Sequence, residues 1–202
     1  MLTGAVPAQP TIAMNAECSA KHGNAVAEPT IVASAKGELA NVVVSISENV
    51  PAGGSAPNEA AVLDQEGCMY KPHVLAMMAG QPLVVRNSDE FLHNVHAMAQ
   101  QNAAFNFAQP NKDPGKPIGD SPKVAENFRV KCDVHPWMSS YIAVFEHPYF
   151  SVSKEDGTFE IRNVPPGEYT IKTWHEALGE KDQKVTVTAG KPAEVKMEYA
   201  AP

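Results

Sequence analysis

The chain has 202 residues, of which 44% are hydrophobic and 19% are charged, so it can bury an ordinary core in one large β-rich domain or in two small ones. Its formal net charge of -7 and its lack of a Lys/Arg cluster argue against a nucleic-acid partner. No apolar run reaches the roughly 18 residues that a membrane-spanning helix needs, so we expect no membrane span.

The N-terminal quarter combines an irregular segment with the first strand patterns. Residues 1–28 are rich in Ala, Pro and Asn and lack periodicity, which predicts an extended arm. Strand patterns begin at 30–32 and return at 40–46, with a turn at 35–38 between them. Residues 51–57 contain two glycines and indicate a linker or loop. No convincing helix pattern occurs anywhere in the chain.

From residue 61 onward, short strand patterns follow one another closely. The pattern at 82–87 is expected to pair back onto the pattern at 72–78, across a turn at 79–81. Residues 100–123 form a long polar stretch, and its core at 111–117 is expected to be a loop. The other strand patterns of this region lie at 61–64, 94–98, 127–132 and 142–145.

The strand pattern at 127–132 alternates cleanly between apolar and charged residues. Phe128, Val130 and Cys132 face one side of the strand, and Arg129 and Lys131 face the other. Cys132 is therefore expected to point into a core at the end of a strand, where a metal ligand is shielded from water.

The tail from residue 150 to 199 is predicted to be entirely β. A sheet of about 50 residues has one apolar face and nothing to cover it, so it is marginally stable alone. We favour a sandwich built from residues 29–58 and 148–202, with residues 59–147 inserted between them as a second domain. The alternative is a sequential arrangement that joins the early strands to the middle domain. The expected tail strands are 159–162, 168–174, 184–188 and 194–199.

Two short segments carry the donor atoms of a mononuclear copper site. Cys132, His135 and Met138 form a C-x2-H-x2-M run, and His93 and His96 lie upstream. Thiolate and thioether sulfur suit Cu(I), imidazole suits both oxidation states, and a trigonal His2Cys core with a weak axial Met suits electron transfer. Either upstream histidine can supply the second imidazole. Because positions three apart face opposite sides of a strand, only one of the two histidines faces the core.

Residues 61–146 resemble a small cupredoxin of the amicyanin and plastocyanin type, which is a Greek-key β-sandwich with a type 1 blue copper site. The likeness rests on residues 72–87 with their Ala-Gly turn, on Leu92-His93-Asn94-Val95-His96, and on the run from Cys132 to Met138. The ligands that this resemblance implies are His93, Cys132, His135 and Met138.

The resemblance also implies roles around the ligands. Asn94 would tie the two ligand loops together. His135 would be the ligand through which electrons leave, and Pro136 and Trp137 would form an apolar docking face for a redox partner protein. The alternative is that Trp137 points inward and packs against the core.

The tail resembles a carboxypeptidase-regulatory-like, transthyretin-like β-sandwich. The residues that carry this likeness are 154–161 and 164–170, with 37–44 as the opening pair. Such modules are usually non-catalytic, and the likeness supports the inserted arrangement. The expected fold class is therefore all-β, with a cupredoxin sandwich and a second, smaller sandwich.

Three cysteines are present, and one of them is the candidate ligand. A Cys18–Cys68 disulfide is the simplest arrangement of the other two, and it implies an oxidising compartment; the alternative is two unrelated buried thiols. The first residues, Met1–Gly4, lack the features of a signal peptide, so the chain is either cytosolic or a processed or recombinant form. The candidate site favours the processed form, in the periplasm or outside the cell.

We expect an electron-transfer protein and not an enzyme. A nitrite-reductase-type enzyme or copper oxidase would need histidines flanking the cysteine to serve a second copper, whereas Lys131 and Asp133 flank Cys132. A binuclear thiolate centre would need a second cysteine on the loop. The alternatives are copper carriage or storage, an extracellular structural module with an incidental site, and, more weakly, a zinc site, because thioether is a poor zinc ligand.

Overall fold

The computed structural model describes all 202 residues, and almost all of its regular structure is β, as predicted. The chain forms two compact units. Unit 1 comprises residues 1–9, 29–54 and 147–202, and unit 2 comprises residues 10–28 and 55–146. The segment expected to be an arm, residues 1–28, is thus divided between the two units.

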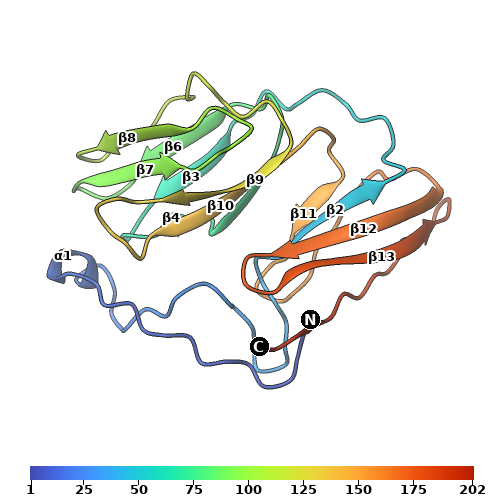
Figure 1. The fold of residues 1–202 in the computed structure, drawn as a ribbon, viewed down its shortest axis with the longest axis horizontal. Helices are drawn as coiled ribbons and strands as arrows, with labels where there is room; N and C mark the ends of the chain where they lie inside the picture. The colour runs from blue at the N-terminus through green and yellow to red at the C-terminus, as the bar shows by residue number, and fades with distance from the viewer. The chain divides into compact units, whose positions relative to one another are not determined.

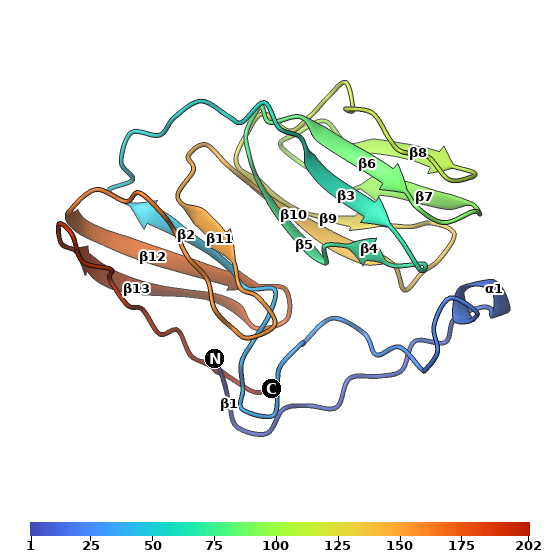
Figure 2. The same cartoon turned by 180° about the vertical axis from the view of Figure 1, so that it is seen from behind.

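Unit 2 is a sandwich of two sheets, which Figures 1 and 2 show stacked face to face. One sheet has the strand order β5-β10-β9-β7-β8 and the other has the order β4-β3-β6. The inward side chains of both sheets form one core that includes Leu63, Leu83, Val95, Val130 and Ile142. The strands are β3 (Ala61–Gln65), β4 (Tyr70–Lys71), β5 (Val74–Met78), β6 (Leu83–Asn87), β7 (His93–Ala97), β8 (Phe105–Gln109), β9 (Glu126–Lys131) and β10 (Ser139–Phe145).

The prediction that β5 and β6 pair as a hairpin is wrong. β5 pairs in parallel with β10, and β6 pairs in parallel with β3, so the turn at 79–81 carries the chain from one sheet to the other. Gly80 adopts a φ of 81° in this turn, a value that glycine reaches without steric cost. Local pattern shows that both segments are strands, but the partner of each strand is set by residues far away in the sequence.

Strand β8 was not expected, because it lies inside the polar stretch 100–123. It pairs antiparallel with β7 at the edge of the five-stranded sheet. Phe105 and Phe107 are only half-buried there, and Asn106 and Ala108 are exposed. An edge strand with so little burial leaves a weak hydrophobic pattern in the sequence.

Unit 1 contains one four-stranded sheet with the order β11-β2-β12-β13 and a short parallel pair, β1 with β14. Leu39, Val44, Ile171 and Tyr199 lie in its main core. The strands are β1 (Leu2–Thr3), β2 (Val43–Glu48), β11 (Phe150–Val152), β12 (Gly167–His175), β13 (Gly179–Val187) and β14 (Tyr199–Ala200).

Two expected strands of unit 1, at 30–32 and 159–162, are irregular in the structure, and so is the expected strand at 194–199 except for Tyr199, which begins β14. Their apolar residues, among them Ile31, Phe159 and Val195, still pack against the core of the sheet. Alternating apolar residues therefore mark a segment that covers the sheet, even though this segment forms no ladder of backbone hydrogen bonds.

The one helix, α1 (Ala16–Ser19), is a single turn that the sequence patterns did not predict. Asn15 caps it, since its side-chain oxygen accepts a hydrogen bond of 2.8 Å from the Cys18 N–H. Cys18 forms a disulfide with Cys68, which confirms the predicted pairing. No helix of this structure has both the length and the apolar character that crossing a membrane requires.

Candidate metal centre

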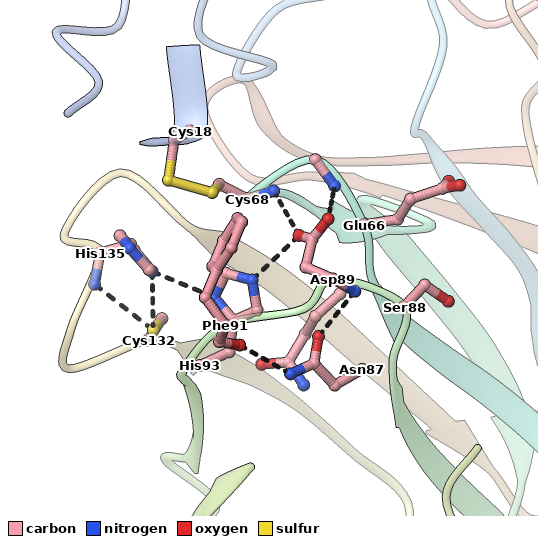
Figure 3. A network of polar contacts seen from close by, with 12 residues as sticks. Cys18, Glu66, Cys68, Asn87, Ser88, Asp89, Phe91, His93, Cys132 and His135 are labelled. Atoms are coloured by element: carbon pink, nitrogen blue, oxygen red, sulfur yellow. Dashed lines mark hydrogen bonds and ion pairs between the residues drawn. A yellow bond between two sulfur atoms is a disulfide. The ribbon is translucent and has the colours of Figure 1, made fainter. Parts of the chain in front are cut away.

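Three metal-binding side chains meet at one end of the unit 2 sandwich (Figure 3). His93 is the first residue of β7, Cys132 directly follows β9, and His135 lies on the loop between β9 and β10. Their donor atoms all lie within 4.8 Å of one another. The three residues are 0%, 3% and 4% exposed, so an ion held between them is shielded from water.

The separations between these donors suit a single ion. The Nδ1 atoms of His93 and His135 are 3.0 Å apart, and Sγ of Cys132 is 3.9 Å from Nδ1 of His135. Bonds of about 2.0 Å to nitrogen and about 2.3 Å to sulfur allow at most roughly 4.0 Å between two nitrogens and 4.3 Å between nitrogen and sulfur on one first-row ion. Both observed separations lie within these limits.

The ligand loop is a compact turn closed by its own backbone. The Cys132 N–H donates to the Met138 carbonyl at 3.1 Å, and the Met138 N–H donates to the His135 carbonyl at 2.9 Å. Met138 is completely buried and belongs to the same core cluster as Cys132. The C-x2-H-x2-M spacing thus brings a thiol, an imidazole and a thioether to one turn at the buried end of β9.

The sulfur of Cys132 accepts two backbone hydrogen bonds. The N–H groups of Asn94 and His135 each lie 3.4 Å from Sγ. These two donors fix the position of the sulfur between the segments that carry His93 and His135. Asn94 also links the two ligand segments, because its Oδ1 accepts a 3.1 Å hydrogen bond from the Asp133 N–H and its Nδ2 donates to Asn106 at 2.7 Å.

Asp89 orients the His93 ring. Its Oδ2 lies 3.0 Å from Nε2 of His93, and its two oxygens accept hydrogen bonds from the N–H groups of Gly67 and Cys68, at 3.0 and 2.9 Å. An Nε2–H that donates to this carboxylate leaves the Nδ1 lone pair of His93 free to bind a metal. Burial opposes the ionisation of Asp89, but the hydrogen bonds from Cys68, His93 and Gly67 outweigh it and lower its pKa. Sequence reasoning missed Asp89, because one aspartate in a polar loop carries no distinct signal.

Asn87 holds the loop that carries Asp89. Its Oδ1 accepts a hydrogen bond of 3.0 Å from the Asp89 N–H. Its Nδ2 donates to the carbonyl oxygens of Phe91, Gln109 and Asn111, at 3.0, 3.1 and 3.1 Å. The loop that leads to His93 is therefore fixed from within the core.

His135 lies in an apolar surround that keeps its imidazole neutral. Burial lowers its pKa, and the nearby His93 lowers it further. The rings of Trp137 and Phe91 lie 5.2 and 6.4 Å from the His135 ring. A neutral imidazole has the free lone pair that a metal ligand needs.

The two residues of the expected docking face have different surroundings. Pro136 is exposed, whereas Trp137 is half-buried, packs against the core and donates from Nε1 to the Cys68 carbonyl at 3.1 Å. His96 lies outside the donor cluster, where its Nδ1 is 3.0 Å from a carboxylate oxygen of Asp133. As alternation along the strand requires, His93 is buried and His96 is not.

Two further groupings of metal-binding residue types lie beside the donor cluster. One joins Cys18 and Cys68 to His135, and the other joins Cys68 to Asp89 and His93. Both include sulfur that is already bonded in the disulfide, and a disulfide offers no thiolate. Of the three groupings, only the one that contains Cys132 includes a free cysteine.

The C-terminal part of the chain matches a known family model. Residues 146–195 match the family model described as polysaccharide lyase family 4, domain II. This fibronectin-like type differs from the carboxypeptidase-regulatory-like type, which therefore stays a prediction. A search of curated proteins found no match.

Several solved copper proteins are similar to about half of the chain. A copper-containing nitrite reductase from Thermus scotoductus SA-01 is 20% identical with a TM-score of 0.36, over 50% of this chain and 25% of that chain. Amicyanin from Paracoccus versutus is 20% identical with a TM-score of 0.35, over 50% of this chain and 97% of its own. A purple cupredoxin from Nitrosopumilus maritimus is 18% identical with a TM-score of 0.33, over 42% of this chain and 99% of its own.

The chain thus spans about a quarter of the nitrite reductase and nearly all of the two smaller proteins. At such low identities and TM-scores, these likenesses carry no argument about activity.

Proposed function

We propose that the protein is a mononuclear type 1 copper protein that transfers electrons in an exported compartment. The observation that carries this proposal is the buried convergence of one thiol and two imidazole nitrogens, in which Cys132 and His135 share a turn with the buried thioether of Met138 and His93 comes from β7. The residues proposed to hold the copper are His93, Cys132, His135 and Met138.

The donor set favours copper over zinc. Thiolate and thioether sulfur suit Cu(I), whereas thioether is a poor ligand for zinc. Copper, when bound, supplies a couple that accepts and releases one electron. The protein contributes rigidity, since His93 is held by Asp89 and the Cys132 sulfur is held by two N–H groups. A fixed ligand set keeps the rearrangement between oxidation states small.

The full burial of the donors argues for electron transfer and against copper carriage, because a carrier must load and release its ion through an open site. Lys131 and Asp133 flank Cys132, so the histidine relay to a second copper that we associate with an enzyme has no counterpart here. The Cys18–Cys68 disulfide supports a location in the periplasm or outside the cell.

Copper loading of the metal-free protein tests the proposal. One equivalent of Cu(II) should produce an intense visible thiolate band and a type 1 paramagnetic-resonance spectrum. Cys132→Ser and His93→Ala should abolish both. The matched control is His96→Ala, which removes a nearby imidazole from outside the cluster and should keep the band. A Cys132→Ser protein that stays coloured would contradict the assignment.

The partner is proposed to be a redox protein that docks on the exposed part of the ligand loop. Val134 and Pro136 are exposed on either side of His135, and an apolar contact of this kind permits close approach without burying charge. Val134→Lys should slow electron exchange with the partner and leave the copper spectrum unchanged. Val62→Lys is the control, because Val62 on β3 is similarly exposed, 37% against 44% for Val134. Equal rates for the two variants would exclude this docking face.

A further inference from the structure

The ring of His135 is covered even though its loop is at the surface. Its neighbours Val134 and Pro136 are exposed, whereas His135 itself is 4% exposed. The sulfur atoms of Cys18 and Cys68 lie within 4.8 Å of a nitrogen of the His135 ring, and Figure 3 shows this disulfide beside the ring at α1. A reducible bond is therefore one of the groups that enclose the candidate ligand, together with the rings of Trp137 and Phe91.

Cys18 belongs to a loop whose two ends meet, here called the cap and defined as residues 10–28. The Glu28 N–H donates to the Pro10 carbonyl at 2.9 Å, and the Ile12 N–H donates to the Val26 carbonyl at 2.8 Å. Thr11 and Ala27 form an isolated bridge between the same two ends. The cap is thus closed on itself at its base and carries Cys18 on its single helical turn.

The cap has one covalent attachment to the sandwich, and its other contacts are weak. Besides the disulfide, His22 Nε2 donates to the Gly67 carbonyl at 2.7 Å, and the Lys21 ammonium lies 5.4 Å from the centre of the Phe91 ring. Met14 is partly buried against the core. A single hydrogen bond and a cation–π contact each contribute about 1 kcal/mol, so the disulfide is the main restraint on the cap.

The other half of the disulfide is connected to both candidate histidine ligands. Gly67 and Cys68 have positive φ values of 64° and 54°, which point their successive N–H groups at Asp89, the residue that orients His93. The Cys68 carbonyl accepts the hydrogen bond from Trp137, whose ring lies against His135. A change at Cys68 therefore alters the surroundings of both His93, through Asp89, and His135, through Trp137.

We propose that the cap is a redox-controlled cover, and that reduction of Cys18–Cys68 uncovers the His135 ring. A dithiol or phosphine reductant supplies two electrons, the S–S bond takes up two protons and becomes two thiols, and the reductant is oxidised. Without the S–S bond only the weak contacts hold the cap, so it separates from the ring. The copper role of His135 rests on the proposed function, whereas the covering of the ring does not.

Chemical labelling of the metal-free protein tests the cover directly. Diethyl pyrocarbonate modifies accessible neutral imidazoles, and peptide mass spectrometry reports the rate at each histidine. Labelling of His135 should be at least tenfold faster in the Cys18→Ser/Cys68→Ser variant than in the disulfide-bonded protein. His96, which is already accessible, is the internal control and should react at the same rate in both. Equal rates at His135 would overturn the proposal.

A second form of the experiment covers the case in which the double variant does not fold. Wild-type protein reduced with a phosphine, and shown by circular dichroism to keep its β structure, should give the same acceleration. The disulfide-bonded Lys21→Ala/His22→Ala variant should stay protected, because it loses only the weak contacts. If that variant is labelled as fast as the reduced protein, the disulfide does not control the cover.

Copper loading separates the failure of this inference from the failure of the proposed function. A blue band with unchanged labelling of His135 would reject the cover and keep the copper site. Accelerated labelling without a blue band in the copper-loaded protein would keep the cover and reject the copper site.

Discussion

Asp89 is the residue whose replacement tests the candidate centre most directly, because it lies outside the proposed ligand set but contacts His93, a proposed ligand. Asp89→Asn removes one negative charge and keeps the size of the side chain. The amide oxygen can still accept the hydrogen bonds from His93 and Cys68, which share one carboxylate oxygen, but the NH2 group must then face the N–H of Gly67. We expect copper to bind and the thiolate band to remain.

The expected shift in reduction potential follows from Coulomb's law. The carboxylate oxygen lies 3.0 Å from Nε2 of His93, and the ring and the metal bond add roughly 4 Å, so the charge lies about 7 Å from the ion. At an effective dielectric constant near 20, a unit charge at this distance contributes about 2.4 kcal/mol, which is about 100 mV. The lost charge had favoured Cu(II), so the potential of Asp89→Asn should rise by up to about 100 mV.

The same replacement should destabilise the metal-free protein. A hydrogen bond to a charged group contributes about 1.5–3 kcal/mol, and here one N–H also loses its acceptor. The folded-state pKa of Asp89 is lowered, so its stabilisation is complete above the unfolded-state value near 3.9 and is lost as the pH falls through the lower folded-state pKa. The difference in unfolding free energy between wild type and Asp89→Asn should therefore be full at pH 7 and shrink below about pH 4.

Two measurements test the expected effects of Asp89→Asn on the reduction potential and on the free energy of unfolding. Voltammetry of the copper-loaded proteins gives the potential, and urea unfolding of the metal-free proteins at several pH values gives the free energy. Asp156→Asn is the control, because it removes the same charge and an acceptor of a backbone N–H from an exposed turn of unit 1. If Asp89→Asn changes the potential no more than Asp156→Asn does, the carboxylate does not act on the metal through His93.

Four further predictions concern the ligands and their support. Met138→Leu should keep the visible band, since the axial bond is weak, and raise the reduction potential in voltammetry. Asn87→Ala should cost about 1–3 kcal/mol in urea unfolding, because it leaves buried carbonyls without their donor. Replacing Cys18 and Cys68 by Ser should cost about 4 kcal/mol in the chain-entropy model for a separation of 50 residues, and an unchanged urea midpoint would contradict this. Burial lowers the folded-state pKa of His135, so the melting temperature of the metal-free protein should fall as the pH drops below about 6.5, and His135→Phe should flatten this fall.

The sequence by itself predicted the donor set of the candidate site. The spacing Cys132-x2-His135-x2-Met138 lies within a single turn, so local backbone geometry is enough to gather those donors. The alternation along residues 127–132 placed Cys132 in the core, and the offset of three residues separated His93 from His96. The disulfide also followed from the sequence, because only two cysteines remained once Cys132 was set aside.

Only the tertiary structure decided which distant groups surround those donors. The positions of Asp89 beside His93 and of the cap over His135 depend on a turn at Gly67–Cys68, a loop fixed by Asn87 and a chain segment some 50 residues before the turn. The pairing of β5 with β10 and of β6 with β3 depends on nonlocal partners in the same way. Periodicity reports which face of a segment is buried, but it does not report what buries it, because that contact is made by residues that the chain brings together only on folding.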